Sequence, residues 1–110
     1  DRLFMCGCAS PAPTGEPPRF VFALARSQDA VAAGRTGMSG IDALVKLDLV
    51  TGESSEIRAS DSISEVCFGE PCFVPAAAAT TADDGFILAL RSDGTTGTTA
   101  LQIFDARSFS

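Results

Sequence analysis

The 110 residues of this sequence contain no histidine. Acid–base or metal chemistry would therefore fall to its glutamate, aspartate and cysteine side chains. The absence of histidine excludes a Ser-His-Asp or Cys-His nucleophilic centre and a histidine-ligated metal site within these residues. Asp83 and Asp84 could bind Ca²⁺, but they lack EF-hand spacing and precede Gly85, which favours a turn. Glu70, taken alone, is typical of a solvated loop carboxylate. The sequence by itself is therefore a poor candidate for a complete enzyme.

The four cysteines, at positions 6, 8, 67 and 72, lack the spacing of a zinc site. Such a site takes two close pairs with roughly two to four residues between partners, whereas a single residue separates Cys6 from Cys8. Cys67 and Cys72 flank a Gly-Glu-Pro turn. We favour buried thiols that pack as small hydrophobes over a metal site or a disulfide. Free thiols indicate a reducing intracellular compartment, the cytoplasm or a plastid, rather than secretion.

Composition and charge bound the class of protein further. The chain is 45% apolar and 20% charged, which predicts one small folded unit rather than a disordered chain. Its formal net charge is −6 and its cations are scattered, so nucleic acid is excluded as a partner. No apolar run of about 18 or more residues could span a membrane, and residues 1–5 lack the features of a signal peptide. Because neither end carries a start or stop signal, we expect a fragment of a longer protein.

Apolar residues recur with a period of two in short runs, which indicates strands. In the run 19–25 both alternating sets are apolar, so we expect this strand to be buried on both sides. A hairpin over 42–58 turns at Thr51-Gly52, and its first strand should be half-buried with Lys46 on the polar side. The other expected strands, which bring the total to about seven, are 3–8, 72–74, 86–90 and 100–104.

No helix is predicted, and residues 26–41 are interpreted as a flexible connection. Their glycines, Gly34, Gly37 and Gly40, lie three apart and do not match the pattern of a dinucleotide-binding loop. Short strands at this spacing indicate a sandwich, a barrel or a propeller. The segments 44–48 and 101–105 share a pattern and lie about fifty-seven positions apart, roughly one propeller repeat plus an insertion.

Four segments, in order and at matching spacing, resemble the motifs of the carotenoid oxygenase family. Residues 42–52 are similar to its recurring hairpin "aLvKyDl-x-tG", and residues 68–75 resemble its signature "GEPxFVP". Residues 82–88 are similar to "EDDGyll", and residues 101–107 to "LxilDAr". The resemblance is strongest over 42–107. Two positions depart from it, since alanine stands at 76 for the usual arginine and at 82 for an acid.

The resemblance implies an all-β fold, with residues 1–110 forming about two blades of a seven-bladed β-propeller. In this family four histidines hold a non-haem Fe(II) on the propeller axis, and glutamates hold those histidines in turn. Glu70 corresponds to one of these glutamates. A carboxylate can accept the second N–H of a ligating imidazole and so fix its tautomer and orientation. None of the iron-binding histidines lies in this chain, so the implied Fe(II) has its ligands elsewhere.

The implied activity of the complete protein is O₂-dependent cleavage of a conjugated double bond in a carotenoid or apocarotenoid to carbonyl products. Stilbenes and retinoids are substrates of other family members, so the substrate, the cleavage position and the choice between dioxygenase and isomerohydrolase stay open. The resemblance allows peripheral membrane contact. The alternative is a non-catalytic, propeller-like binding module. Five phenylalanines could line an apolar tunnel, but core packing is the better interpretation for Phe20, Phe22, Phe73, Phe86 and Phe104.

Overall fold

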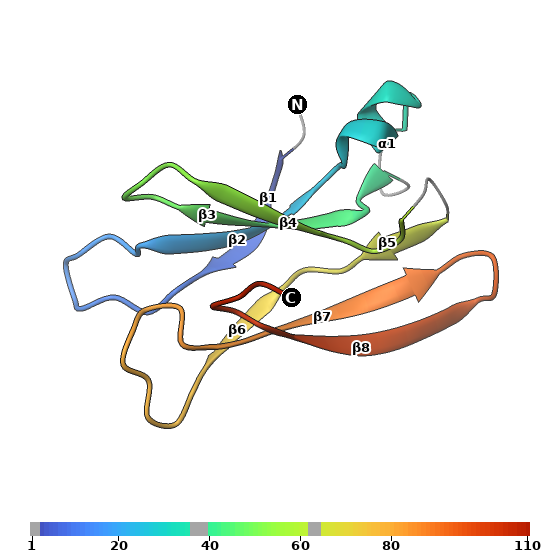
Figure 1. Cartoon of the computed structure of the whole chain (residues 1–110). Helices are drawn as coiled ribbons and strands as arrows, with labels where there is room; N and C mark the ends of the chain where they lie inside the picture. The colour runs from blue at the N-terminus through green and yellow to red at the C-terminus, as the bar shows by residue number, and fades with distance from the viewer. Residues whose placement is uncertain (1–2, 36–39, 62–64) are drawn as a thin grey trace.

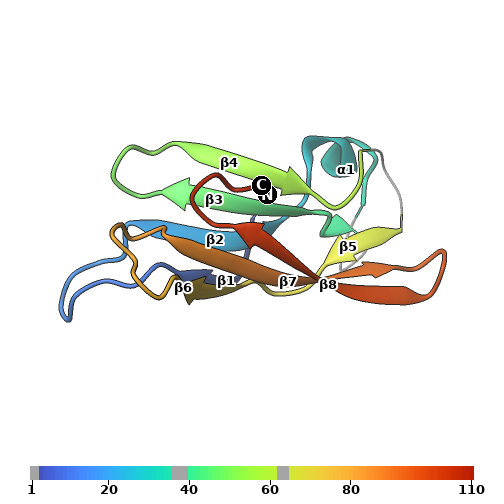
Figure 2. The ribbon, with the colours of Figure 1, turned by 60° about the horizontal axis from the view of Figure 1, so that its bottom comes forward.

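Two antiparallel sheets lie face to face with the hydrophobic core between them (Figures 1 and 2). The structure, a computed structural model, describes residues 3–35, 40–61 and 65–110, with residues 3–6 described by their backbone only. The first sheet follows chain order, with each strand antiparallel to the next. Its strands are β1 (Leu3–Ala9), β2 (Phe20–Ala25), β3 (Ala43–Asp48) and β4 (Ser54–Arg58). The predicted all-β class is confirmed.

The second sheet is built around its longest strand, β7 (Gly85–Asp93). β8 (Thr98–Asp105) pairs with β7 along one edge, and a strand was predicted within each of them. The other edge of β7 is shared by two short strands in succession, β5 (Val66–Phe68) and β6 (Cys72–Pro75). β5 was not predicted from the sequence, because three residues are too few to show alternation.

A short helix, α1 (Gln28–Ala32), corrects the prediction that residues 26–41 are a flexible connection without helix. Ser27 caps it: its hydroxyl accepts a hydrogen bond from the backbone N–H of Ala30 at 3.1 Å and donates one to Asp42 at 2.6 Å. The cap and an acid in the first turn were the available signals, but one turn is too short to give a helical period. Gly37 lies outside the described residues.

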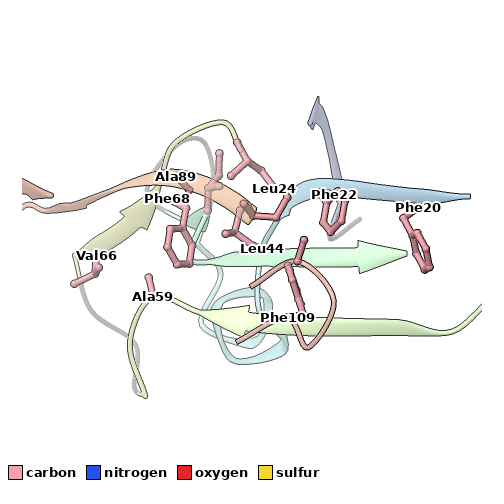
Figure 3. Close-up of a cluster of buried hydrophobic side chains, with 12 residues drawn as sticks. Phe20, Phe22, Leu24, Leu44, Ala59, Val66, Phe68, Ala89 and Phe109 are labelled. Carbon is pink, nitrogen blue, oxygen red and sulfur yellow. The ribbon is translucent and has the colours of Figure 1, made fainter. Parts of the chain in front are cut away.

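The core joins the two sheets through side chains that point toward one another (Figure 3). β2 contributes to this core with one face and to a second, smaller apolar cluster with the other, as predicted for a strand buried on both sides. Four of the five phenylalanines considered for a tunnel pack in or against the core, but Phe86 is exposed, so core packing is wrong for that residue. The main core consists of Phe20, Phe22, Leu24, Ile41, Leu44, Ala59, Val66, Phe68, Ile87, Ala89, Ala106 and Phe109.

The hairpin over 42–58 forms as predicted, but β3 is not the half-buried strand that its alternation suggests. Lys46 is only 8% exposed, whereas Leu49 is 55% exposed just beyond the strand. Lys46 lies on the same face as Leu44, two positions away, and that face meets the second sheet. A buried ammonium is stable only where acceptors surround it, and the second sheet supplies them.

The outer face of the second sheet carries large apolar side chains that the described residues leave exposed. Phe86 and Leu90 of β7 are 45% and 51% exposed, and Leu101 and Ile103 of β8 are 56% and 62% exposed.

Within the described parts of the chain, no helix is long and apolar enough to cross a membrane.

Candidate functional site

Glu70 lies at a bulge between β5 and β6, the two strands that pair in succession with the same edge of β7. Phe68 pairs with Arg91 and Cys72 pairs with Leu88, so three residues on the β5–β6 side face two on β7. One extra residue is therefore accommodated at Gly69-Glu70-Pro71. Bulges bend a strand locally and re-aim its side chains, and they are common next to active sites.

The bulge changes which side chains face the core. Phe68 is 1% exposed and belongs to the core, and the ring of Phe73, five positions later, packs against the same core. An uninterrupted strand would send side chains five positions apart to opposite faces. The single extra residue restores Phe73 to the inner face and leaves Glu70 at the kink between two regular segments.

The neighbours of Glu70 hold its backbone and leave its side chain free. The N–H of Gly69 donates to the carbonyl oxygen of Leu90 at 2.7 Å, which continues the ladder up to the bulge. Pro71 is buried and restricts Glu70 to an extended backbone. The Glu70 side chain is exposed, so the sequence-predicted site residue sits on an anchored backbone with its carboxylate in solvent.

Two thiols lie beside this carboxylate, one from each sheet. β1 of the first sheet contacts β6 of the second, and Cys8 on β1 packs against the core. Burial raises the pKa of Cys8; a hydrogen bond from the backbone of Phe73 opposes this, and the negative charges of Cys72 and Glu70 add to it. Cys8 of the first sheet is thus near enough to Glu70 and Cys72 of the second sheet for their charges to act on its thiol.

The expectation of buried thiols is only partly correct. Cys8 and Cys67 are half-buried free thiols, but Cys72 is exposed, because the bulge turns its side chain to the outer face while Phe73 turns inward. The side chain of Cys6 lies outside the described part of the chain.

The described residues do not form a metal site of their own. No group of three or more cysteine, aspartate or glutamate side chains among residues 3–35, 40–61 and 65–110 is arranged to hold a metal ion. The sequence has no histidine, so the ligand set of a histidine-bound iron cannot come from this chain. The exposed carboxylate of Glu70, on a backbone held by its neighbours, fits a different role. It could accept the N–H of an imidazole that binds the metal with its other nitrogen.

Asp83 and Asp84 do form the predicted turn, but both also make ion pairs that the sequence did not reveal. Asp83 Oδ2 lies 2.8 Å from Lys46 Nζ, and Asp84 Oδ2 lies 3.2 Å from Arg107 Nη2. Burial favours the neutral form of Asp83, yet hydrogen bonds from Lys46 and Thr81 outweigh it, so the pKa of Asp83 is below its usual value. Lys46 is the residue that sequence reasoning missed; its only signal was a cation within an apolar strand.

The family model described as RPE65, retinal pigment epithelial membrane protein, matches residues 6–110. Cobalt-substituted apocarotenoid oxygenase from Synechocystis superimposes with a TM-score of 0.70 and 28% sequence identity over 86% of this chain. A chimera of that oxygenase with RPE65 gives a TM-score of 0.67 at 28% identity. A search of curated proteins gave no match.

The chain therefore belongs to the carotenoid oxygenase family, and the two sheets are part of its β-propeller. The chain spans 18% of the length of the solved oxygenases that it matches, so it corresponds to a part of such a protein.

Proposed function

We propose that this chain is part of a non-haem iron(II) dioxygenase that cleaves a conjugated double bond of a carotenoid or apocarotenoid to two carbonyl products. The family match over residues 6–110 and the 28% identity to an apocarotenoid oxygenase support the class of enzyme. The observation that carries the proposal is the place of Glu70 in the bulge, next to β6, which contacts β1 where the two sheets meet.

Glu70 would act on the metal centre through a histidine supplied from elsewhere in the protein. Its carboxylate would accept the imidazole N–H that is not used for iron, which holds the ring at one angle and raises its basicity. Pro71 and the ladder bond of Gly69 limit how far the carboxylate can move. Bound iron(II) would supply the activation of O₂.

The substrate class follows from the same family assignment. Carotenoids and apocarotenoids are long and apolar, so they partition into membranes, and a peripheral membrane contact of the complete protein would give access to them. O₂ is the second substrate. The assignment is compatible with the free thiols described above, which fit a reducing compartment such as the cytoplasm or a plastid.

The experiment that tests the proposal is a cleavage assay on the complete protein loaded with iron(II). An apocarotenal, a hydroxylated stilbene and a retinyl ester are each incubated under ¹⁸O₂, and the products are analysed by mass spectrometry. Two carbonyl products carrying ¹⁸O from the apocarotenal are the expected result. Retinol formed from the ester without ¹⁸O would indicate an isomerohydrolase instead. Tight apocarotenal binding without conversion would favour the non-catalytic binding module.

A further inference from the structure

Lys46 connects the two sheets through all three of its ammonium hydrogens. Nζ donates to Asp83 Oδ2 at 2.8 Å, to the carbonyl oxygen of Ala106 at 2.8 Å and to that of Arg107 at 3.0 Å. A lysine ammonium has three donors, so none is left unpaired. Nζ also lies 4.6 Å from the centroid of the Phe20 ring, within the range of a cation–π interaction.

The acceptors come from two separate segments of the second sheet. Asp83 belongs to the loop between β6 and β7 and is held by the Thr81 hydroxyl at 3.0 Å. The carbonyls of Ala106 and Arg107 belong to the turn after β8. Asp105 shapes that turn, because its Oδ1 accepts from the backbone N–H groups of Arg107 and Ser108 at 2.8 and 3.0 Å. One side chain of β3 thus joins the open end of the β7–β8 hairpin, where β7 begins and β8 ends, to the first sheet.

Three of the four segments that carry the family resemblance meet at this point. Lys46 is the lysine of the first hairpin motif, Asp83 an aspartate of the "DDG" turn, and Ala106 and Arg107 the last residues of the "DAr" motif. The side chains of Lys46 and Asp83 are only 10% and 14% exposed, so the pair is shielded from water. We call Lys46, Asp83 and the carbonyls of Ala106 and Arg107 the intersheet latch.

A chain of packed residues connects the latch to β6, the strand that follows Glu70. Lys46 pairs with Phe22 across β2 and β3, and the Phe22 ring stacks on Phe73 of β6 with centroids 5.7 Å apart. Phe73 follows Glu70 by three positions. Cys8 pairs with Phe22 from the other side and packs against the same core, and the contact between β1 and β6 leaves its thiol half-buried.

We infer that the intersheet latch sets the spacing of the two sheets and keeps β1 against β6, so that Lys46 is a positioning residue for the edge where Glu70 lies. The consequence for iron rests on the function proposed above for Glu70. The spacing itself does not, because it depends only on contacts within this chain.

Cys8 provides a direct readout, because its half-buried thiol becomes more accessible when β1 and β6 separate. In the complete protein carrying Cys6→Ser, the alkylation rate of each remaining cysteine is measured by mass spectrometry at a temperature well below unfolding. In Lys46→Met the Cys8 rate should rise about tenfold or more, while Cys67 and Cys72, on the opposite face of the second sheet, keep their rates. Asp83→Asn should act in the same direction and serves if Lys46→Met does not fold.

Arg19→Met is the matched control. Arg19 also pairs with an aspartate, Asp48, at 3.1 Å and lies 5.0 Å from the Phe20 ring, but both partners are in the first sheet. Its removal should leave the Cys8 rate unchanged. An unchanged Cys8 rate in Lys46→Met and Asp83→Asn, or an equal rise at all three cysteines, would overturn the latch. A faster Cys8 with unchanged iron affinity would uphold the latch and contradict the role proposed for Glu70.

Discussion

The rings of Phe22 and Phe73 stack with centroids 5.7 Å apart and planes inclined by 17°, which brings β2 of the first sheet against β6 of the second. This contact exists because the bulge at Glu70 returns Phe73 to the inner face of its sheet. Packing between the sheets and the position of Glu70 at a kink therefore have one structural cause, the extra residue opposite β7.

Replacing Phe73 by leucine should destabilise the complete protein. The substitution keeps an apolar side chain but removes the ring stack and leaves a small cavity, at an expected cost of about 1–2 kcal/mol in the free energy of unfolding. Urea unfolding followed by circular dichroism measures the difference. Val50→Ala, in the exposed hairpin turn, is the control and should change stability by less than about 0.5 kcal/mol. Equal effects of the two substitutions would contradict the packing described.

Stability should fall in acid between about pH 4 and pH 2. A hydrogen bond from Arg19 lowers the pKa of Asp48 from 3.8 to about 2, despite some desolvation. Because the folded pKa lies below the unfolded one, the stabilisation is complete above the unfolded value and is lost as pH falls through the folded value. Asp83, whose pKa is also lowered, adds to the effect in the same direction.

Urea unfolding of the complete protein at pH 6, 4 and 3 measures this dependence. Lys46→Met and Arg19→Met should each flatten it, since each removes the partner that lowers one carboxyl pKa. If a variant keeps the pH dependence of the unchanged protein, the ion pair that it lacks does not contribute to the pH dependence of stability in solution.

The sequence predicted the family and the hairpin over 42–58, because each depends on a local pattern of residue types; the role of Glu70 stays a prediction. The burial of Lys46 could not be predicted in this way, since its acceptors lie 37, 60 and 61 positions away in the chain. The inner position of Phe73 and the exposure of Cys72 likewise depend on a bulge that appears only once β5 and β6 pair with β7.

Gly85 marks a second close approach between strands. A Cβ there would clash with the carbonyl oxygen of Val74 and lie 2.9 Å from Pro75 Cα, both backbone atoms of β6. Gly85→Ala should therefore cost about 2 kcal/mol or more, because β6 must move away from β7. Gly69→Ala is the matched control, since its added Cβ meets the Leu90 side chain at an ordinary 3.6 Å. Thermal unfolding of both variants tests this, and Gly85→Ala should have the lower melting temperature. Equal melting temperatures would refute the predicted clash.

The uncovered apolar face of the second sheet should make this 110-residue chain associate when it is produced alone. Exposed leucine, isoleucine and phenylalanine side chains on β7 and β8 form one patch, and open sheet edges add to it. Light scattering and binding of a hydrophobic dye should both be high, and Leu101→Lys with Ile103→Lys should reduce them. A monodisperse monomer with a sharp cooperative melt and no dye binding would contradict this prediction.

The measurement that tests the account most directly is the iron affinity of the complete protein carrying Glu70→Gln. A neutral amide at this position accepts the imidazole N–H less strongly, so iron affinity and turnover should fall about 10- to 100-fold while the melting temperature without metal stays the same. Glu65→Gln is the control, because the Glu65 side chain is exposed and pairs with Arg35 at the surface. Iron affinity in Glu70→Gln equal to that of the control would contradict the assignment of Glu70 to the metal centre.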